Sequence, residues 1–330
     1  MHPPSPQARI VLLGTGGTIA ATAGRASALT DYSVTEDITA MLDAVPGAHE
    51  LADIQCEQVF NVDSSELTGA MVLRLARRIE ALTRDPMVDG IVVTHGTDTL
   101  EETAFLLHLT IHSPKAIVLV GAMRPASALS ADGPLNLYNA LSLAAHPDSR
   151  GCGILLMMND QILAARYATK SHTTRVDAFN AIGPGALGWI SQGVPHIVQG
   201  LTHATLPAFT LKGMSKAPRV DIIYDHQGAG AHLYEASIAA GARGIVIAGT
   251  GNGSLSPGAH KGGALARRKG LMCVRSSRVP YGEVGARDTD ARTGLICSHG
   301  LNPQQSRILL MLALANDLDQ AAIQARFKAC

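Results

Sequence analysis

Two glycine-rich segments place hydroxyl groups where a nucleophile could act. LLGTGGTIA, residues 12–20, follows an apolar run and contains Thr18, and VVTHGTDTLEETA, residues 92–104, continues another apolar run and contains Thr97 and Asp98. In open α/β sheets, sites form beyond the carboxyl ends of strands, and glycines there let the backbone approach a ligand while a neighbouring hydroxyl stays exposed. A tight turn would explain the glycines, but not the threonine beside them. The two segments are therefore a candidate threonine-nucleophile site.

A threonine hydroxyl is a poor nucleophile until a base removes its proton. The candidate bases are Lys170 in YATKSHTT, Tyr32 in TDYSV and Asp98. A lysine acts as a base when burial lowers its pKa and a carboxylate positions it, although most lysines are simply solvated on the surface. His95 is a further candidate, but a histidine at a strand end is often only a hydrogen-bonded core group. The residues alone leave these alternatives open.

One hydroxyl of the second segment has a structural explanation. Thr99 followed by Glu102 fits the S/T-x-x-E capping box. We expect a helix to begin there, with the Thr99 side chain as its cap. Capping does not explain Thr97 or Asp98, which remain candidates for chemistry.

The common nucleotide-binding patterns are absent from the first segment. A G-x-G-x-x-G motif would need glycine where Ile19 stands, and no G-K-[ST] follows. Lys plus Arg and Asp plus Glu both total 27, so the formal net charge is zero. A chain with this balance has no excess of positive charge that would attract nucleic acid or an anionic membrane. We therefore expect a small polar partner.

The cysteines and histidines form no evident disulfide or metal pattern. The five cysteines are widely scattered without C-x-x-C, which is typical of free thiols in a reducing compartment, and we interpret them as buried small hydrophobes. His108 and His112 have the i, i+4 spacing that can bind zinc on a helix, but no third ligand accompanies them. We expect no metal.

The N-terminal stretch MHPPSPQAR has neither the basic n-region nor the apolar h-region of a signal peptide. No apolar run approaches the roughly 18 residues needed to span a bilayer. These features predict a cytoplasmic protein, whereas earlier removal of a signal peptide would place it in the periplasm.

The elements that must position these side chains alternate along the chain. Short β-branched apolar runs occur at 9–13, 90–95, 115–123, 152–158, 219–224, 244–249, 271–275 and 294–298. Such runs suit strands that are buried on both faces of a parallel sheet. Between them, an amphipathic helix is predicted at 66–82, and another begins at Asn302 as N-cap with Pro303 in the first helical position.

The length of 330 residues is large for one hydrophobic core, so two domains are expected. Periodicity is weakest at residues 199–218, which we interpret as the linker. A larger N-terminal domain, 1–198, would carry both threonine segments, and 219–330 would form a smaller C-terminal domain. The predicted fold class is α/β, each domain holding a mostly parallel, Rossmann- or flavodoxin-like sheet flanked by helices.

The two threonine segments together resemble the signature stretches of bacterial-type L-asparaginases, the asparaginase/glutaminase family. VGAMRPASALSADGPLNLYNA, YATKSHTT, VRSSRVP and LNPQQSRILLMLAL also resemble family segments and stand in the expected order. The resemblance extends from Arg9 to about Phe327. It implies an amidohydrolase that converts L-asparagine to L-aspartate and ammonia, with glutaminase activity as a side reaction, and it implies no cofactor.

The resemblance also assigns site residues by motif. Catalytic roles fall on Thr18 as nucleophile, on Tyr32 in a mobile lid segment, and on Thr97, Asp98 and Lys170 as a second group. Ser64 matches the serine that binds the substrate α-carboxylate, and the Ala122 carbonyl matches a contact to the substrate amide. Backbone N–H groups at Gly96 and Thr97 would stabilise the oxyanion. Asp98 would pair with the α-ammonium.

Three positions depart from the family pattern. Ser65 stands where secreted members usually carry Gln or Glu, which bears on localisation and on glutamine use. In the C-terminal domain, family members donate residues to a neighbouring subunit's site. The matching positions here are Ser254 and an acidic residue after Pro280, for which Glu283 is preferred over Asp288 and Asp290. Such donation implies a homotetramer built as a dimer of intimate dimers.

Two other functions fit the same resemblance. One is the ammonia-producing, asparaginase-like subunit of a tRNA-dependent amidotransferase, which usually carries an additional N-terminal domain, whereas here the first strand is predicted from Arg9. The other is a non-catalytic amino-acid sensor, which would need only the binding residues. The presence of all five catalytic matches favours the amidohydrolase.

Overall fold

The chain folds into two α/β units. A computed structural model describes residues 7–27, 31–199, 209–214 and 216–330. Contacts divide the chain into Met1–Thr202 and His203–Cys330. Half of the predicted linker, 199–218, lies outside the described residues, so that boundary stays a prediction.

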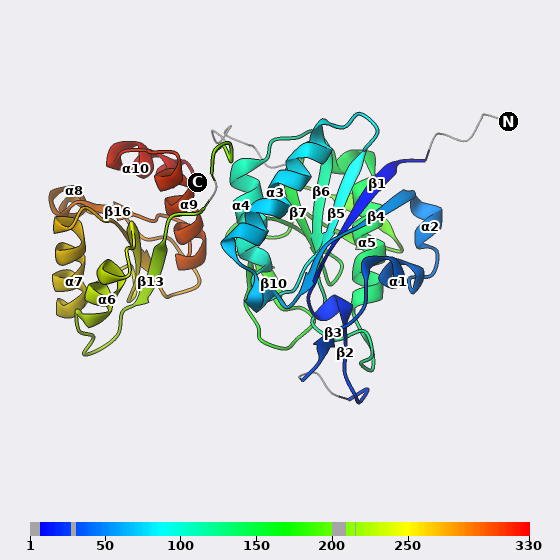
Figure 1. Cartoon of the computed structure of the whole chain (residues 1–330), viewed down its shortest axis with the longest axis horizontal. Coiled ribbons are helices and arrows are strands. Elements are labelled where there is room, and N and C mark those ends of the chain that lie inside the picture. The colour runs from blue at the N-terminus through cyan, green and yellow to red at the C-terminus, as the bar shows by residue number, and fades with distance from the viewer. Residues whose placement is uncertain (1–6, 28–30, 200–208, 215) are drawn as a thin grey trace. The chain divides into compact units, whose positions relative to one another are not determined.

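The first unit is built on an eight-stranded sheet in the order β12-β11-β8-β7-β6-β5-β1-β4, of which Figure 1 labels β7, β6, β5, β1 and β4. Five strands run parallel: β4 (Asp53–Val62), β1 (Arg9–Gly16), β5 (Gly90–Thr94), β6 (Ala116–Val120) and β7 (Ile154–Met158). The other three pair antiparallel: β8 (Gln161–Ala164), β11 (Gly188–Ser191) and β12 (Val194–Ile197). The α/β class with a mostly parallel sheet is confirmed, and the antiparallel strands make this sheet mixed.

Tight two-residue turns explain why the sheet becomes antiparallel after β7. Asn159 and Asp160 join β7 to β8 with φ of 48° and 60°, and Gln192 and Gly193 join β11 to β12 with φ of 52° and 76°. Positive φ at both central residues suits the turns that connect hairpins. A parallel connection would have needed a crossover of a dozen or more residues.

Edge strand β4 was not predicted from the sequence. Its residues, DIQCEQVFNV, alternate in character, and most of them are only half-buried or exposed. It therefore lacks the continuous apolar run that identified its neighbours. β4 nevertheless pairs with β1 along most of its length, so its carboxyl end joins those of the predicted strands.

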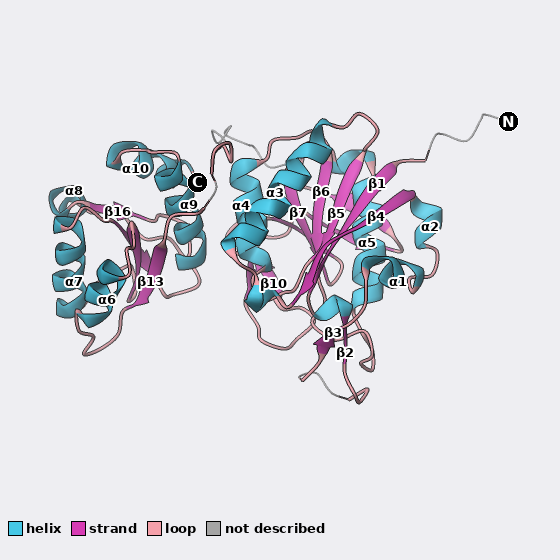
Figure 2. Cartoon of the chain, in the orientation of Figure 1, coloured by secondary structure: helices cyan, strands magenta, loops and turns pink. Residues whose placement is uncertain are grey.

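Helices cover both faces of this sheet, as Figure 2 shows. One face carries α3 (Gly69–Arg84) and α4 (Leu100–Thr110), and the other carries α1 (Ile38–Asp43), α2 (Ala48–Leu51) and α5 (Gly133–Ala145). Apolar side chains of α1, α2 and α5 form one buried cluster with Ile10 and Leu12 of β1. Smaller elements are the hairpins β2 (Ala21–Thr22) with β3 (Ser33–Val34) and β9 (Ala168–Lys170) with β10 (Phe179–Ala181), and the 3₁₀ turns η1 (Thr18–Ala20), η2 (Ser64–Glu66) and η3 (Pro147–Ser149).

The helix predicted at 66–82 is α3, which begins three residues later than expected. η2 occupies the preceding turn, and the Thr68 hydroxyl accepts the Met71 N–H as the helix cap. Leu75 and Ile79 are buried, as the amphipathic pattern predicted. The helix is thus fixed by its apolar face on the sheet.

The second unit contains a four-stranded parallel sheet in the order β13-β14-β15-β16. Its strands are β13 (Val220–Tyr224), β14 (Gly244–Gly249), β15 (Met272–Ser277) and β16 (Leu295–Cys297), which confirms the four predicted runs. Its helices are α6 (His232–Ala239), α7 (Pro257–Arg268), α8 (Asp288–Thr293), α9 (Pro303–Ala315) and α10 (Gln320–Ala329). Asn302 caps α9 by accepting the Gln305 N–H, as predicted.

All five cysteines are free thiols. Cys273 and Cys297 are buried, in line with their interpretation as small hydrophobes, but Cys56, Cys152 and Cys330 are only partly buried. Among the described residues, the longest apolar helices fall short of what a membrane span requires.

Candidate active site

The carboxyl ends of β4, β1, β5 and β6 lie side by side at one edge of the first unit's sheet, because these strands are parallel neighbours. The turns that follow them touch through their backbones. Gly17 has φ of 83°, and a Cβ there would lie 2.2 Å from the Gly96 Cα. A Cβ on Gly96 would lie 2.6 Å from the Ser64 Oγ. Only glycine allows this approach, so the glycines of both segments bring the strand ends together.

Thr18 lies directly after β1, at the start of η1, and faces a tyrosine. The Thr18 Oγ1 and the Tyr32 hydroxyl oxygen are 2.8 Å apart. The Thr18 side chain is buried, with 5% exposure, so its hydroxyl is shielded from bulk water. A hydroxyl with a second oxygen acid–base group at hydrogen-bond distance has the geometry expected of an activated nucleophile.

A second hydroxyl relay follows β5. The Lys170 Nζ donates to the Thr97 Oγ1 at 2.9 Å and to the Asp98 Oδ1 at 2.6 Å. The lysine side chain is 16% exposed and that of Asp98 is 58% exposed. Lys170 is therefore not the solvated surface lysine of the alternative interpretation. The Asp98 carboxylate holds the Lys170 ammonium beside the Thr97 hydroxyl, and Asp98 itself also lines the cavity described below.

Lys170 is held in place by a buried carboxylate that was not predicted from the sequence. Glu101, in the first turn of α4, is 5% exposed, and its Oε2 accepts the Thr169 hydroxyl and the Lys170 backbone N–H. Burial raises the pKa of Glu101, and these two hydrogen bonds act in the opposite direction. The start of α4 is thereby joined to β9, which carries Lys170.

Thr99 does not form the predicted capping box. α4 begins after Thr99, as expected, but the Thr99 side chain makes no capping hydrogen bond. Its Oγ1 donates instead to the Ser64 carbonyl oxygen at 2.9 Å. The prediction failed because Thr99 has ψ of 14° instead of the extended backbone of an N-cap, and the Glu102 N–H donates to the Thr99 carbonyl oxygen at 3.1 Å. The hydroxyl therefore connects two strand ends rather than closing a helix.

Ser64 and Ser65 follow β4 and lie differently. Ser64 is 3% exposed, and its Oγ accepts the Asp98 N–H at 3.2 Å. Ser65 is exposed, and its hydroxyl donates to the Asp63 Oδ1 at 2.7 Å. Ser65 thus borders the cavity, whereas Ser64 lies behind its wall. The predicted binding roles of both serines stay predictions.

The cavity at this edge of the sheet has a volume of about 410 Å³. Thr18, Tyr32, Ser65, Thr97, Asp98 and Lys170, all predicted, line it. Sequence reasoning missed Asp31, Asp63, Met123, Thr173 and Thr174, which line it too. A signal for them existed, because each lies within four residues of a predicted position in the same segment.

Ala122 lies two residues after β6 and is fully buried, and its neighbour Met123 lines the cavity instead. The backbone N–H groups of Met123 and Arg124 both donate to the Asp132 carboxylate at 2.9 Å. Asp132 thereby fixes the segment that carries the Ala122 carbonyl. The predicted contact of that carbonyl with substrate stays a prediction.

His95 precedes Gly96 and is completely buried. Its Nδ1 lies 2.7 Å from the Gly96 carbonyl oxygen and its Nε2 lies 2.9 Å from the Thr103 Oγ1. Burial lowers the pKa of His95 to about 4, against the opposite effect of the Gly96 hydrogen bond. The alternative of a hydrogen-bonded core histidine, rather than a base exposed to substrate, therefore describes its position.

Of the predicted residues of the second unit, Ser254 and Glu283 lie in loops, and Asp288 and Asp290 lie in α8. Ser254 pairs with Thr250 in an isolated bridge, and Glu283 and Asp288 are exposed. Asp290 is 6% exposed and binds Arg275 through both carboxylate oxygens, at 2.8 and 2.5 Å. Asp290 is therefore occupied inside its own unit, which removes it as an alternative to Glu283.

His108 and His112 do not share a helix face, because α4 ends at Thr110. The two histidines were expected on one helix, and only this placement is wrong, because His112 lies beyond its end. Across residues 7–27, 31–199, 209–214 and 216–330, no group of three or more His, Cys, Asp or Glu side chains is arranged to hold a metal ion.

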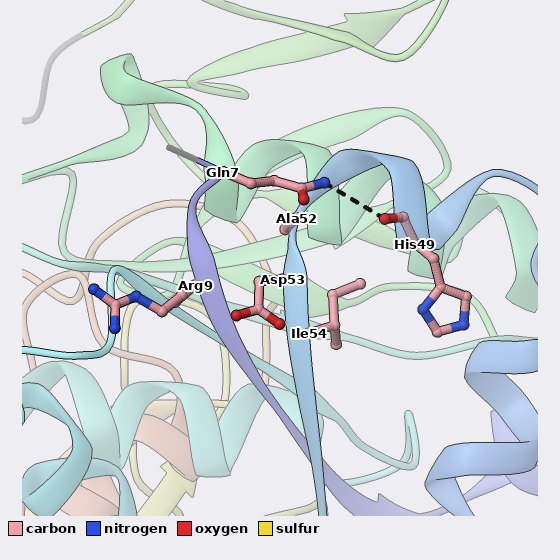
Figure 3. A pocket seen from close by; sticks show the side chains of 6 residues that line it. All are labelled: Gln7, Arg9, His49, Ala52, Asp53 and Ile54. Atoms are coloured by element: carbon pink, nitrogen blue, oxygen red, sulfur yellow. Dashed lines mark hydrogen bonds between the residues drawn. The ribbon is translucent and has the colours of Figure 1, made fainter. Parts of the chain in front are cut away.

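A second hollow, of about 540 Å³, lies at the opposite end of the sheet (Figure 3). It is lined by Gln7, Arg9, His49, Ala52, Asp53 and Ile54, and the Gln7 Nε2 donates to the His49 carbonyl oxygen at 3.4 Å. Arg9 and Asp53 are the first residues of β1 and β4, so this is the amino end of the strands. Sites in open α/β sheets form at the carboxyl ends, which favours the threonine-lined cavity.

Comparison with known proteins agrees with this geometry. Residues 9–202 match the family described as "Asparaginase, N-terminal", and residues 219–327 match "Glutaminase/Asparaginase C-terminal domain". "L-asparaginase 2" of Bacillus subtilis strain 168 is 44% identical over 321 residues, covering 96% of this chain and 85% of that protein. "Glutaminase-asparaginase" of Acinetobacter glutaminasificans is 40% identical over 329 residues, covering 96% and 98%.

A solved structure shows the same fold. The crystal structure of a "Probable Cytoplasmic L-asparaginase" from Campylobacter jejuni superimposes with a TM-score of 0.95 at 42% sequence identity. The match covers 98% of this chain and 100% of that one.

Proposed function

The chain belongs to the asparaginase family, and from that premise we propose that it hydrolyses L-asparagine to L-aspartate and ammonia through an acyl-enzyme on Thr18. The observation that carries the proposal is the convergence of two hydroxyl relays on one cavity. Thr18 lies 2.8 Å from Tyr32, and Thr97 lies 2.9 Å from Lys170. All four side chains line that cavity.

The first half-reaction starts at Thr18. Its Oγ1 forms a bond to the side-chain amide carbon of the substrate while its proton passes to the Tyr32 oxygen, which gives its own hydroxyl proton to the substrate amide nitrogen. The carbonyl oxygen becomes an oxyanion, which backbone N–H groups at Gly96 and Thr97 stabilise. The C–N bond then breaks, and the nitrogen leaves as ammonia with the returned proton.

The second half-reaction uses water. A water molecule attacks the acyl carbon, the bond to Thr18 Oγ1 breaks, and the hydroxyl recovers its proton as L-aspartate leaves. In the Thr97–Lys170–Asp98 relay the Thr97 Oγ1 takes the proton of that water while its own hydroxyl proton passes to the Lys170 Nζ, 2.9 Å away, a transfer that requires the lysine as its neutral amine. The burial of Thr18 and Thr97 strengthens each of these electrostatic interactions.

Charged groups around the cavity suit a free amino acid. Asp98 offers a carboxylate to the α-ammonium, and Ser64 and Ser65 lie in the turn where the α-carboxylate would bind. Glutamine is longer by one methylene, which a pocket discriminates by only about 1–3 kcal/mol. A relative named glutaminase-asparaginase supports glutamine as a second substrate.

We place the enzyme in the cytoplasm as a homotetramer in which Ser254 and Glu283 complete a neighbouring subunit's site. The solved relative named cytoplasmic supports the location. The exposure of Glu283 and Ser254 leaves them accessible to a second chain. Cell fractionation and sedimentation velocity test the two statements, and a fully active monomer would refute the second.

The decisive experiment measures ammonia release by the purified protein with L-asparagine and, in parallel, L-glutamine. We expect release from asparagine, and loss of turnover with retained asparagine binding in Thr18→Ala. Turnover by Thr18→Ala would remove Thr18 as nucleophile. Binding without turnover by the wild type would favour a sensor, and release only in the presence of a partner protein would favour an amidotransferase subunit.

A further inference from the structure

The imidazole of His95 is sealed from substrate, yet it contacts the turn that carries Thr97. Its exposure is 0%. A carbonyl oxygen only accepts hydrogen bonds, so the Nδ1, 2.7 Å from the Gly96 oxygen, carries the proton and donates. The Nε2 of the neutral ring then accepts the Thr103 hydroxyl, 2.9 Å away. Two partners on opposite sides of the ring thus fix both its orientation and its tautomer.

The hydrogen bond to Gly96 sets the plane of a peptide that faces the site. In a trans peptide the C=O and the following N–H point in opposite directions. Because the Gly96 oxygen points to the His95 ring, the Thr97 N–H points away from it. Within the described part of the chain, that N–H makes no hydrogen bond, although Thr97 is only 3% exposed. A shielded donor is therefore left available beside the Thr97 hydroxyl.

The same peptide lies against the turn that carries Thr18. A Cβ on Gly17 would lie 2.3 Å from the Gly96 N, so these backbones are in direct contact. Glycine permits a wide range of φ and ψ, which means that Gly96 alone would not define the direction of the next N–H. The contact fixes the distance between the two turns, and the imidazole fixes the rotation of the peptide.

We propose that His95 is a positioning residue that orients the Gly96–Thr97 peptide, so that the Thr97 N–H donates to the oxyanion formed when Thr18 attacks the substrate amide. This inference rests on the proposed function. Thr103 acts one step further away, because its hydroxyl keeps the proton of His95 on Nδ1. Neither residue touches the substrate.

Two pairs of substitutions test the proposal in the full-length protein. In His95→Asn the side-chain N–H₂ lies near the position of Nδ1 and can still donate to the Gly96 oxygen. In His95→Gln the amide reaches toward Thr103 instead and loses that donor. Thr103→Ser keeps the hydroxyl that fixes the tautomer, whereas Thr103→Val removes it with little change in volume.

We expect His95→Gln to lower kcat about 10- to 100-fold, because a misdirected oxyanion donor costs part of the 10²- to 10³-fold effect of removing one. KM and the Kd of the product L-aspartate should change less than about threefold, since neither ligand carries the oxyanion. His95→Asn should recover most of kcat. Thr103→Val should lower kcat more than Thr103→Ser does. An aldehyde analogue of asparagine, which adds Thr18 to form an oxyanion, should bind His95→Gln more weakly by the same factor as kcat.

The proposal is overturned if His95→Asn and His95→Gln lose kcat equally, or if KM and aspartate binding change while kcat does not. If both His95 variants fail to fold, equal kcat in the two Thr103 variants overturns it. These results leave the proposed function intact, because the wild type still releases ammonia from asparagine. Absence of turnover in the wild type would overturn both.

Discussion

Acidification should destabilise this protein through one buried imidazole. His95 is completely buried, and burial lowers its pKa from 6.5 to about 4, with no charged neighbour contributing to the shift. Because the folded-state pKa lies below the unfolded one, the unfolded chain binds the proton first as pH falls. The contribution of His95 to stability is therefore fully present above pH 6.5 and is lost as pH falls toward 4.

The size of the effect follows from the shift. One pH unit corresponds to 1.36 kcal/mol, so the change from 6.5 to about 4 corresponds to roughly 3 kcal/mol of unfolding free energy. Other groups titrate in the same range, but their effects cancel in a difference between wild type and His95→Asn. For a chain of this length, such a difference shifts the unfolding temperature by on the order of 5 °C.

Thermal unfolding of both proteins at pH 7 and pH 4 measures this difference. We expect the wild type to lose more stability than His95→Asn on acidification, whatever the stability of the variant at pH 7. His112→Asn, which changes an exposed histidine, is the matched control. If the gap between wild type and His95→Asn is the same at both pH values, His95 is not buried in its neutral form and the reasoning is refuted.

Three substitutions near the relay give further predictions. Thr97→Val should lower kcat at least about 100-fold without unfolding the protein, as steady-state kinetics and circular dichroism will show, because it removes the hydroxyl that accepts from Lys170. Glu101→Gln should lower kcat. It should also gain stability relative to the wild type as pH rises above 4.5, because burial raises the pKa of Glu101 and its ionisation then destabilises the folded wild type. A difference in unfolding temperature between the two proteins that does not change with pH would contradict this. Thr99→Val should raise KM several-fold relative to Thr99→Ser, since only serine keeps a hydrogen bond to the Ser64 carbonyl worth about 1 kcal/mol; equal KM values would argue against that connection.

The sequence predicted the strands that are apolar on both faces and missed those that are not. β5 and β6 are buried at every position, so their residues form continuous apolar runs. β4 alternates at the edge of the sheet, and its DIQCEQVFNV has no such run. Because β4 was missed, the sequence did not indicate that the turn after it, which begins at Asp63, lies beside the turns after β1 and β5. The partner of Thr99 therefore could not be identified from the sequence.

Site residues were predictable where chemistry restricts residue type, and less so where only position matters. A nucleophilic threonine and a lysine beside a carboxylate require particular side chains, and the structure brings Thr18, Thr97 and Lys170 to one cavity. Glu101 supports Lys170 from another element, at a separation of 69 residues. Sequence spacing along one helix gives no indication of that contact.

Close backbone packing brings together the turns that carry the two threonine hydroxyls. A Cβ on Gly17 would lie 2.2 Å from the Gly96 Cα, and a Cβ on Gly96 would lie 2.6 Å from the Ser64 Oγ. Three strand ends thus touch at a point where no side chain fits. A methyl group at Gly96 would push away both the turn that carries Thr18 and the turn that carries Ser64. Because catalysis is sensitive to displacements of about 1 Å, we expect Gly96→Ala to lower kcat even though it leaves both threonine hydroxyls in the chain.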